Sequence, residues 1–205
     1  MPTEQTGRVV QSDGRVARGA GTREALLRAA REVLVEEGFS RASARTVAAR
    51  AGCSQAALFY HFPTVPDLLL AVLDEVSERR DRAYRHAIQT APNRRALLRL
   101  GRQIQRADLA SGDTRVLVEL VAGARSVEGM PEQVLRRLEP WEQLAAEVMA
   151  RVVPRPFRSR LDARAAGHGL AALFLGLELL GSLRPPHDPA PDVLGRLTAL
   201  AGGRR

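Results

Sequence analysis

The chain has one cysteine, no lysine and few aromatic residues, and the single cysteine already excludes several kinds of site. Cys53 cannot form a disulfide within the chain, and a single thiol does not make a metal site. The 205 residues contain no Gly-rich phosphate loop, no His-Glu metal motif and no Gly-x-Ser-x-Gly sequence. We therefore predict a protein that is not an enzyme and that uses no metal and no cofactor.

Long apolar runs are missing as well. Hydrophobic residues make up 45% of the chain, but no run approaches the roughly 18 apolar residues of a membrane-spanning helix. Residues 1–21 lack the continuous apolar core of a secretory signal. We expect a cytoplasmic protein with no membrane partner.

The charge balance is basic. The 31 basic residues, all arginine, outnumber the 23 acidic residues and give a net charge of +8. A basic surface attracts phosphate backbones, so the sign suits nucleic acid. The excess is spread along the chain, however, with +3 on residues 1–63 and +5 on residues 64–205. Charge alone is weak support for a nucleic-acid partner.

The spacing of apolar residues predicts an all-α protein of about nine helices, because no segment alternates as a strand does. We expect a first helix from Thr22 to Gly38, two short helices after it, and a long helix that Thr64 caps and that runs to about Thr90. Beyond Pro92, glycine and proline breakers predict five more helices. They fall near residues 93–110, 113–127, 131–153, 161–183 and 191–201.

Residues 38–67 are the most informative stretch, because they predict two short helices on either side of a glycine turn. Ser43 is a suitable N-cap for the first helix, and Gly52 supplies the left-handed backbone that ends it. Ser54 caps the second helix, which carries residues 55–61. This pattern is a helix-turn-helix, whose second helix can lie in a DNA major groove.

These elements divide the chain into three parts. Residues 1–20 are polar and Gly-rich and are expected to be disordered; residues 21–66 form the helix-turn-helix domain; residues 67–205 form a larger helical domain. The helix at 161–183 is hydrophobic nearly all round, so both of its faces must be covered, one of them by a second subunit. Three glycines are expected to let it approach a neighbouring helix closely: Gly169, Gly176 and Gly181.

Residues 22–76 resemble the N-terminal domain of the tetracycline-repressor (TetR) family of bacterial transcriptional regulators. The remaining helices match that family only in number, length and order. The matching signature consists of Leu26–Ala30, Gly38-Phe39, Ala48, Ala51-Gly52, Leu58-Phe59-Tyr60-His61-Phe62 and Leu68-Leu69.

The resemblance implies a homodimer that binds a roughly palindromic DNA operator, with one recognition helix of each subunit in a major groove. It implies a repressor released by a small-molecule effector, with activation left open, and a dimer formed through helices 161–183 and 191–201. The DNA-binding residues carried over by position are Ala44, Arg45, Gln55, Ala56, Ala57, Phe59, Tyr60 and His61.

Two positions depart from the family pattern. The family usually has tyrosine where this chain has Phe59, and lysine where it has Val65, so two phosphate contacts are lost. Phe59 either faces DNA or belongs to the core of the small domain. The arginines of residues 1–20 either compensate by contacting the DNA backbone or minor groove, or belong to a solvated tail. They are Arg8, Arg15 and Arg18.

Four residues of the larger domain are candidate ligand contacts: Glu119, Trp141, Phe174 and Glu178. Glu119 and Glu178 are acids within apolar runs, where a carboxylate needs a partner such as Arg125. Each acid can instead form a structural ion pair, and Trp141 can be core. Two other functions stay open: a ligand-independent DNA-binding regulator whose larger domain only dimerises, and a helical enzyme or binding module in which the helix-turn-helix is incidental.

Overall fold

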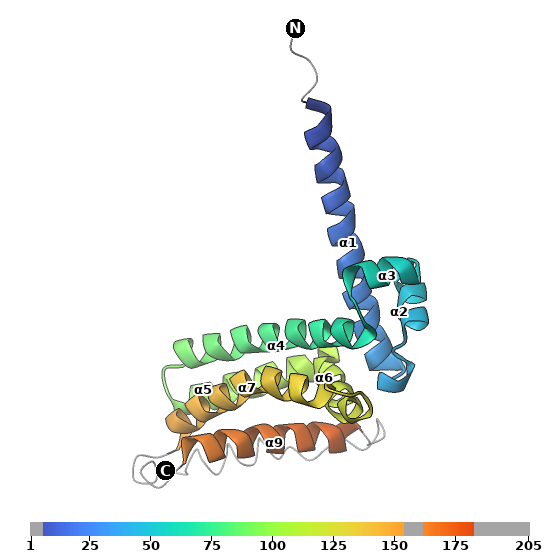
Figure 1. The fold of residues 1–205 in the computed structure, drawn as a ribbon. Coiled ribbons are helices and arrows are strands. Elements are labelled where there is room, and N and C mark those ends of the chain that lie inside the picture. Colours follow the sequence, from blue (N-terminus) through green and yellow to red (C-terminus); the bar gives the residue numbers. More distant parts are fainter. Residues whose placement is uncertain (1–5, 154–161, 183–205) are drawn as a thin grey trace. The chain divides into compact units, whose positions relative to one another are not determined.

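The computed structural model describes residues 6–153 and 162–182 (Figure 1). Within these ranges the chain forms eight α-helices and two short 3₁₀ helices, and no strand, so the predicted all-α class is confirmed. The chain divides into two compact units, Met1–Val72 and Leu73–Arg205, called here the N-terminal and C-terminal units. This division falls inside a helix, α4, a few residues beyond the expected boundary at residue 66.

The N-terminal unit contains four helices that surround one apolar core. They are α1 (Thr6–Glu36), α2 (Ala44–Ala51), α3 (Gln55–His61) and the first part of α4 (Val65–Thr90), with the 3₁₀ helix η1 (Phe39–Arg41) between α1 and α2. The core side chains recur at helical spacing, as predicted. They include Leu26, Leu27, Ala30, Val33, Leu34, Val47, Ala48, Leu58 and Phe62.

Helix α1 begins at Thr6 and not at Thr22. Residues 6–20 are therefore helical, and the expectation that they are disordered is wrong for them. The physical reason is that extending an existing helix costs much less than starting one, even through residues of low helix propensity. At its other end the helix stops as predicted, because Gly38 adopts φ 85° and its N–H donates to the Val33 carbonyl at 3.1 Å.

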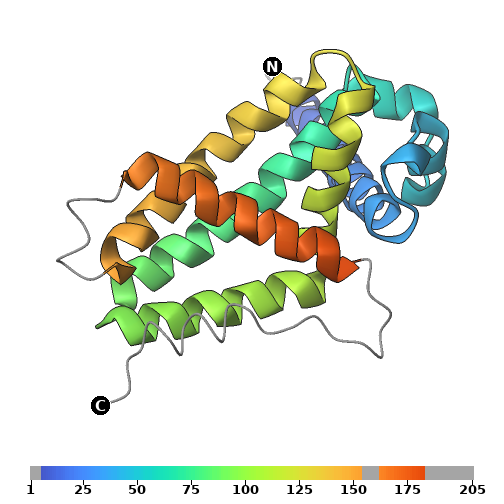
Figure 2. The same ribbon diagram turned by 90° about the horizontal axis from the view of Figure 1, so that it is seen from below.

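The C-terminal unit is a helical bundle. It contains the rest of α4, then α5 (Arg94–Ser111), α6 (Asp113–Gly123), the 3₁₀ helix η2 (Ala124–Ser126), α7 (Met130–Val152) and α9 (Ala163–Ser182). Helices α7 and α9 lie side by side, and α6 contacts both α5 and α9 (Figure 2). The helix expected over 113–127 changes to 3₁₀ geometry after Gly123, and the helix expected over 191–201 lies outside the described residues.

The close approach of α7 and α9 occurs at Gly167. A Cβ atom there would overlap the Glu142 carbonyl oxygen and lie 3.0 Å from the Ala146 nitrogen. A Cβ at Gly169 or Gly176 would meet nothing within 4 Å, so neither glycine approaches another described helix of its own chain, and their expected approach to a second subunit stays a prediction. Both glycines lie roughly half a helical turn away from Gly167 and so face the opposite side of α9. The surroundings of the third glycine, residue 181, lie outside the described residues.

Among the described helices, none taken singly has the length and apolar content to cross a membrane. Helices α3 and α4, taken together as a bent pair, meet that test by length and composition only.

Candidate functional site

The turn between α2 and α3 has the hydrogen bonds of a helix-turn-helix. Gly52 adopts φ 70°, and the next N–H, of Cys53, donates to the Ala48 carbonyl at 3.0 Å. The Ser43 hydroxyl accepts from the Thr46 N–H at 3.2 Å, and the Ser54 hydroxyl accepts from the Ala57 N–H at 3.1 Å. Both predicted N-caps and the predicted glycine turn are therefore confirmed.

Helix α3 has one buried face and one exposed face. Leu58 is fully buried, whereas Gln55 and Ala56 are exposed. Phe59 is 47% exposed and Tyr60 is 84% exposed, so two neighbouring aromatic side chains face outward. The interpretation of Phe59 as core is therefore wrong, and its contact with DNA stays a prediction. The helix thus presents amide, phenyl and phenol groups while Leu58 anchors it to the core.

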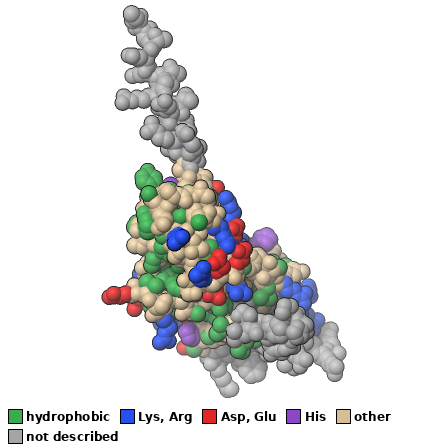
Figure 3. Space-filling view, turned by 90° about the vertical axis from the view of Figure 1, so that its right-hand side faces the viewer, with side chains coloured by type: hydrophobic (Ala, Val, Ile, Leu, Met, Phe, Trp, Pro, Cys, Tyr) green, Lys and Arg blue, Asp and Glu red, His purple; other side chains and the backbone are tan. Residues whose placement is uncertain are grey.

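The remaining residues expected at the DNA are placed on the same two helices. Arg45 is exposed near the start of α2, and Ala44, Ala57 and His61 are half-buried. The Tyr60 and His61 rings meet edge-on with centroids 5.1 Å apart. On the face drawn in Figure 3, basic and acidic side chains are interspersed, which agrees with the even spread of charge in the sequence.

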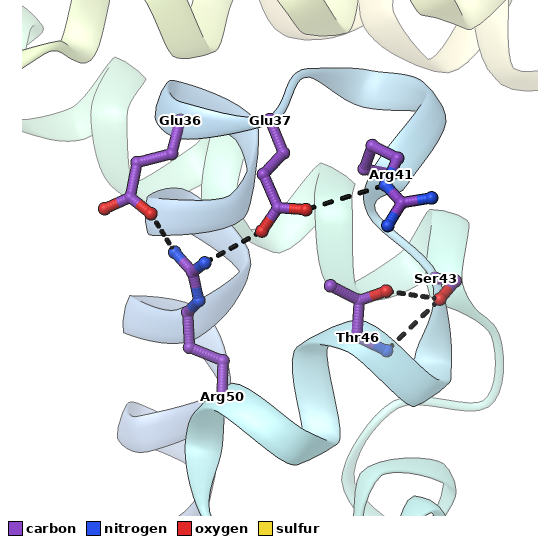
Figure 4. A network of polar contacts seen from close by, with 6 residues as sticks. All are labelled: Glu36, Glu37, Arg41, Ser43, Thr46 and Arg50. Atoms are coloured by element: carbon purple, nitrogen blue, oxygen red, sulfur yellow. Dashed lines mark hydrogen bonds and ion pairs between the residues drawn. The ribbon is translucent and has the colours of Figure 1, made fainter.

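An ion-pair network that the sequence analysis missed joins α1 to α2 (Figure 4). The Arg50 guanidinium donates one hydrogen bond to Glu36 and another to Glu37 Oε1 at 2.8 Å. Glu37 also lies 3.6 Å from Arg41 Nε. The hydrogen bond that Arg50 donates to Glu36 is the main reason that the pKa of Arg50 is raised. The network fixes the last turn of α1 against the end of α2, the helix that precedes the exposed α3.

The start of α4 is closed by the predicted capping box. The Thr64 N–H donates to Asp67 Oδ2 at 3.1 Å, and the Asp67 N–H donates to Thr64 Oγ1 at 3.2 Å. Pro66 has no N–H to offer. This helix start therefore has few backbone donors left for a phosphate, and the Asp67 carboxylate opposes an anion there.

In the C-terminal unit, two of the four candidate ligand residues meet around a third side chain, Arg80 of α4. The Arg80 guanidinium carbon lies 4.6 Å from the Trp141 ring centroid and 4.8 Å from that of Phe174. Trp141 also meets Tyr84 edge-on at 6.1 Å. Arg80 is 1% exposed, and its Nε lies 2.8 Å from Asp108 Oδ2 on α5. The cluster brings together side chains of α4, α5, α7 and α9.

The hydrogen bonding of this cluster is incomplete. Among the described residues, Arg80 Nε and Nη1 donate no hydrogen bond and Asp108 Oδ2 accepts none, since their contact has the distance but not the alignment of one. Each unsatisfied buried polar atom costs about 1–3 kcal/mol. Burial raises the pKa of Asp108, an effect larger than the lowering by the Arg80 charge.

Arg80 was not among the residues singled out from the sequence, although a signal was present. It follows Val76 by four residues and precedes Tyr84 by four, which places it on the buried stripe of α4. Of the other two candidate ligand residues, Glu119 is half-buried on α6, and the Glu178 side chain lies outside the described residues.

The fold and the capped turn define a class: all-helical proteins with an N-terminal helix-turn-helix and a larger helical domain. Residues 26–72 match the sequence profile described as bacterial regulatory proteins, tetR family. This match falls on the helix-turn-helix, within the residues 22–76 for which the sequence predicted a resemblance to that family.

Curated relatives are named as helix-turn-helix (HTH) transcriptional regulators. The chain is 37% identical over 108 residues to uncharacterised HTH-type transcriptional regulators from Mycobacterium bovis and Mycobacterium tuberculosis. The match covers 52% of this chain and 55% of each relative, so it spans about half the length of the curated relatives.

Solved structures share the fold over most of the chain. A TetR-family transcriptional regulator from Streptomyces coelicolor aligns with a TM-score of 0.68 at 22% identity, over 89% of this chain and 92% of that one. The transcriptional regulator FadR from Bacillus subtilis, solved in complex with stearoyl-CoA, aligns with a TM-score of 0.68 at 15% identity, over 87% and 96% of the two chains.

Proposed function

We propose that the chain is a cytoplasmic, sequence-specific DNA-binding transcriptional regulator. It acts as a repressor that binds a palindromic operator as a homodimer and is released by a small-molecule effector. The observation that carries this proposal is the exposed face of α3, where Gln55, Phe59 and Tyr60 point outward around the buried Leu58. The names of the mycobacterial relatives support it.

The exposed groups of α2 and α3 suit DNA chemistry. The Gln55 amide can bond bidentately to adenine, and the Phe59 ring can pack on a thymine methyl in place of a tyrosine–phosphate bond. Arg45 can bond guanine or a phosphate, Ala44 lies beside it, and the small side chains of Ala56 and Ala57 let the helix approach the bases. Tyr60 and His61 are suited to phosphates, which fix the register of the protein on DNA without reading its sequence.

Exposed leucines on α9 support the homodimer. Leu173, Leu179 and Leu180 are 40%, 45% and 62% exposed on a helix whose other side contacts α6 and α7. Such side chains on the most apolar helix of the described chain suit a second copy of the same surface. The further contribution expected from residues 191–201 falls outside the described residues.

The effector belongs to the C-terminal unit in this proposal. FadR from Bacillus subtilis shares the fold and was solved in complex with stearoyl-CoA, which supports a small-molecule effector. Glu119, Trp141, Phe174 and Glu178 stay candidate contacts. The competing proposal is a regulator that ignores small molecules and uses the C-terminal unit only for dimerisation.

The test is selection of bound duplexes from a random DNA pool, followed by titration of the winning sequence at several salt concentrations. We expect a palindromic winner, two chains per duplex and a steep salt dependence. Gln55→Ala should relax discrimination at one base pair of each half-site by about 1–3 kcal/mol. Gln103→Ala, an exposed glutamine on α5, serves as the matched control and should change nothing.

Two results would contradict the proposal. One is a pool that yields no enriched sequence; the other is binding that both Gln55→Ala and Tyr60→Ala leave unchanged. Operator binding that no small molecule alters would instead favour the ligand-independent regulator.

A further inference from the structure

In the C-terminal unit, the buried guanidinium of Arg80 has hydrogen-bond donors that no described residue accepts from. The side chain is 1% exposed, and neither Nε nor Nη1 donates a hydrogen bond to a described residue. Asp108 faces it at 2.8 Å but is not aligned to accept. A buried cation with idle donors can bind a further acceptor, and an anionic acceptor binds it most strongly.

The surroundings of Arg80 restrict the shape of that acceptor. The donors of a guanidinium form a planar fork that matches the two oxygens of a carboxylate. Trp141 and Phe174 lie against the same guanidinium at 4.6 and 4.8 Å, so any molecule that reaches it also meets two aromatic rings. The guanidinium is thus bordered by the Asp108 carboxylate and by two aromatic rings.

We infer that Arg80 is the anion-binding residue of the effector site and that the effector is a monocarboxylate with an apolar body. This inference rests on the proposed function, because it identifies the class of effector that the regulator binds. A single buried guanidinium compensates one negative charge, and a phosphate would bring a second one at a high desolvation cost.

The carboxylate of the effector takes the place of Asp108 beside Arg80. The ion pair between Arg80 and Asp108 joins α4 to α5, so its exchange for a ligand carboxylate separates these two helices. The raised pKa of Asp108 makes this exchange easier, because a carboxyl group that gains a proton gives up its partner without leaving a buried negative charge.

The experiment uses the full chain and the emission of Trp141, which is its only tryptophan and touches Arg80. Octanoate, dodecanoate and hexadecanoate are the probes, with 1-dodecanol as the uncharged control and dodecyl phosphate as the dianionic one. We expect at least one carboxylate to change the emission in a saturable manner, and both dodecyl controls to bind more weakly than dodecanoate.

Variants on either side of the ion pair should act in opposite directions. Arg80→Gln should weaken carboxylate binding roughly tenfold or more, since it removes a charged hydrogen-bond donor. Asp108→Asn should strengthen binding, because the ligand no longer competes with a carboxylate. Arg79→Gln is the matched control: Arg79 is the neighbouring arginine, pairs with Asp113 at 2.9 Å and is half exposed. If Arg80→Gln does not fold, the direction of the Asp108→Asn effect decides.

The inference is overturned if no carboxylate changes the emission, if 1-dodecanol or dodecyl phosphate binds as well as dodecanoate, or if Asp108→Asn weakens binding. Operator binding measured on the same samples separates the two proposals. A chain that binds its operator but no carboxylate overturns this inference alone. A chain that binds carboxylates through Arg80 but selects no DNA contradicts the proposed function alone.

Discussion

The two units of the chain place their polar side chains differently. In the described part of the N-terminal unit the buried core is apolar, and hydroxyls and carboxylates lie at helix ends. In the described part of the C-terminal unit four polar or charged side chains are buried: Arg80, Asp108, Asp113 and Thr114. The first unit keeps its polar chemistry outside, where DNA would meet it. The second keeps polar chemistry inside, where an enclosed small molecule would meet it.

Among substitutions that test this difference between the units, we expect the largest loss of stability at Asp108. Asp108→Ala leaves the Arg80 guanidinium buried without its counter-charge, so the free energy of unfolding should fall by about 3–5 kcal/mol. Chemical denaturation followed by helical circular dichroism measures it. The double variant Arg80→Met/Asp108→Leu should recover most of the loss, because it removes both charges at once. A loss for Asp108→Ala no larger than that of a surface substitution would mean that the pair is not buried in solution.

The corresponding test of the N-terminal unit removes an apolar group. Leu58→Ala opens a cavity under α3 and should lower the free energy of unfolding by about 2–5 kcal/mol. Its neighbour Phe59 provides the control, because Phe59→Ala removes a side chain that is 47% exposed and should change stability by only about 0.5 kcal/mol. Equal losses from the two substitutions in a thermal unfolding experiment would show that α3 is not oriented as described.

The sequence was sufficient for the N-terminal unit because short-range rules govern it. The Ser43 and Ser54 hydroxyls each accept a hydrogen bond from the N–H three residues later. Gly52 adopts a left-handed backbone conformation that few other residues adopt without strain. A spacing of three or four residues is visible in one pass along the chain. There are two exceptions. The Arg50 network joins residues 13 and 14 positions apart. Residues 6–20 are weak helix formers, but they extend a helix that is already established, and this costs little free energy.

The sequence was insufficient for the C-terminal unit because its contacts join distant residues. Arg80 was missed, although its spacing from Val76 and Tyr84 puts it on the buried stripe of α4. Nothing local in the sequence indicates Asp108, Trp141 or Phe174 as its neighbours. The same limit applies to α9, where Gly169 and Gly167 look alike in the sequence. Only the position of α7 decides which of them makes the close approach.

That pair of glycines gives the next prediction. Gly167→Ala forces the backbones of α7 and α9 apart and should lower the free energy of unfolding by about 1–3 kcal/mol. Gly169→Ala adds a methyl group where nothing lies within 4 Å, so it should raise stability by roughly 0.5–1 kcal/mol through better helix propensity. Thermal unfolding of the two variants compares them directly. Effects of the same sign would contradict the described packing of α9 on α7.

The smallest effect concerns the pH dependence of the buried carboxyl of Asp108. Its pKa is raised in the folded chain, mainly by burial, while the charges of Arg80 and Arg79 lower it and that of Asp113 raises it. The folded chain therefore holds this proton more tightly than the unfolded chain does. The contribution of Asp108 to stability is largest below its ordinary value of 3.8 and decreases as the pH rises from there to the raised folded pKa.

Comparison with Asp108→Asn isolates this contribution, because asparagine does not titrate. The free energy of unfolding of the unsubstituted chain, relative to the variant, should fall with pH above 3.8 and then become constant, with a slope no steeper than about 1.4 kcal/mol per pH unit. Urea denaturation at a series of pH values measures both proteins. A relative stability that rises with pH over this window would mean that Arg80 outweighs burial at Asp108. The carboxylate would then hold its place beside Arg80 too firmly for another anion to exchange with it.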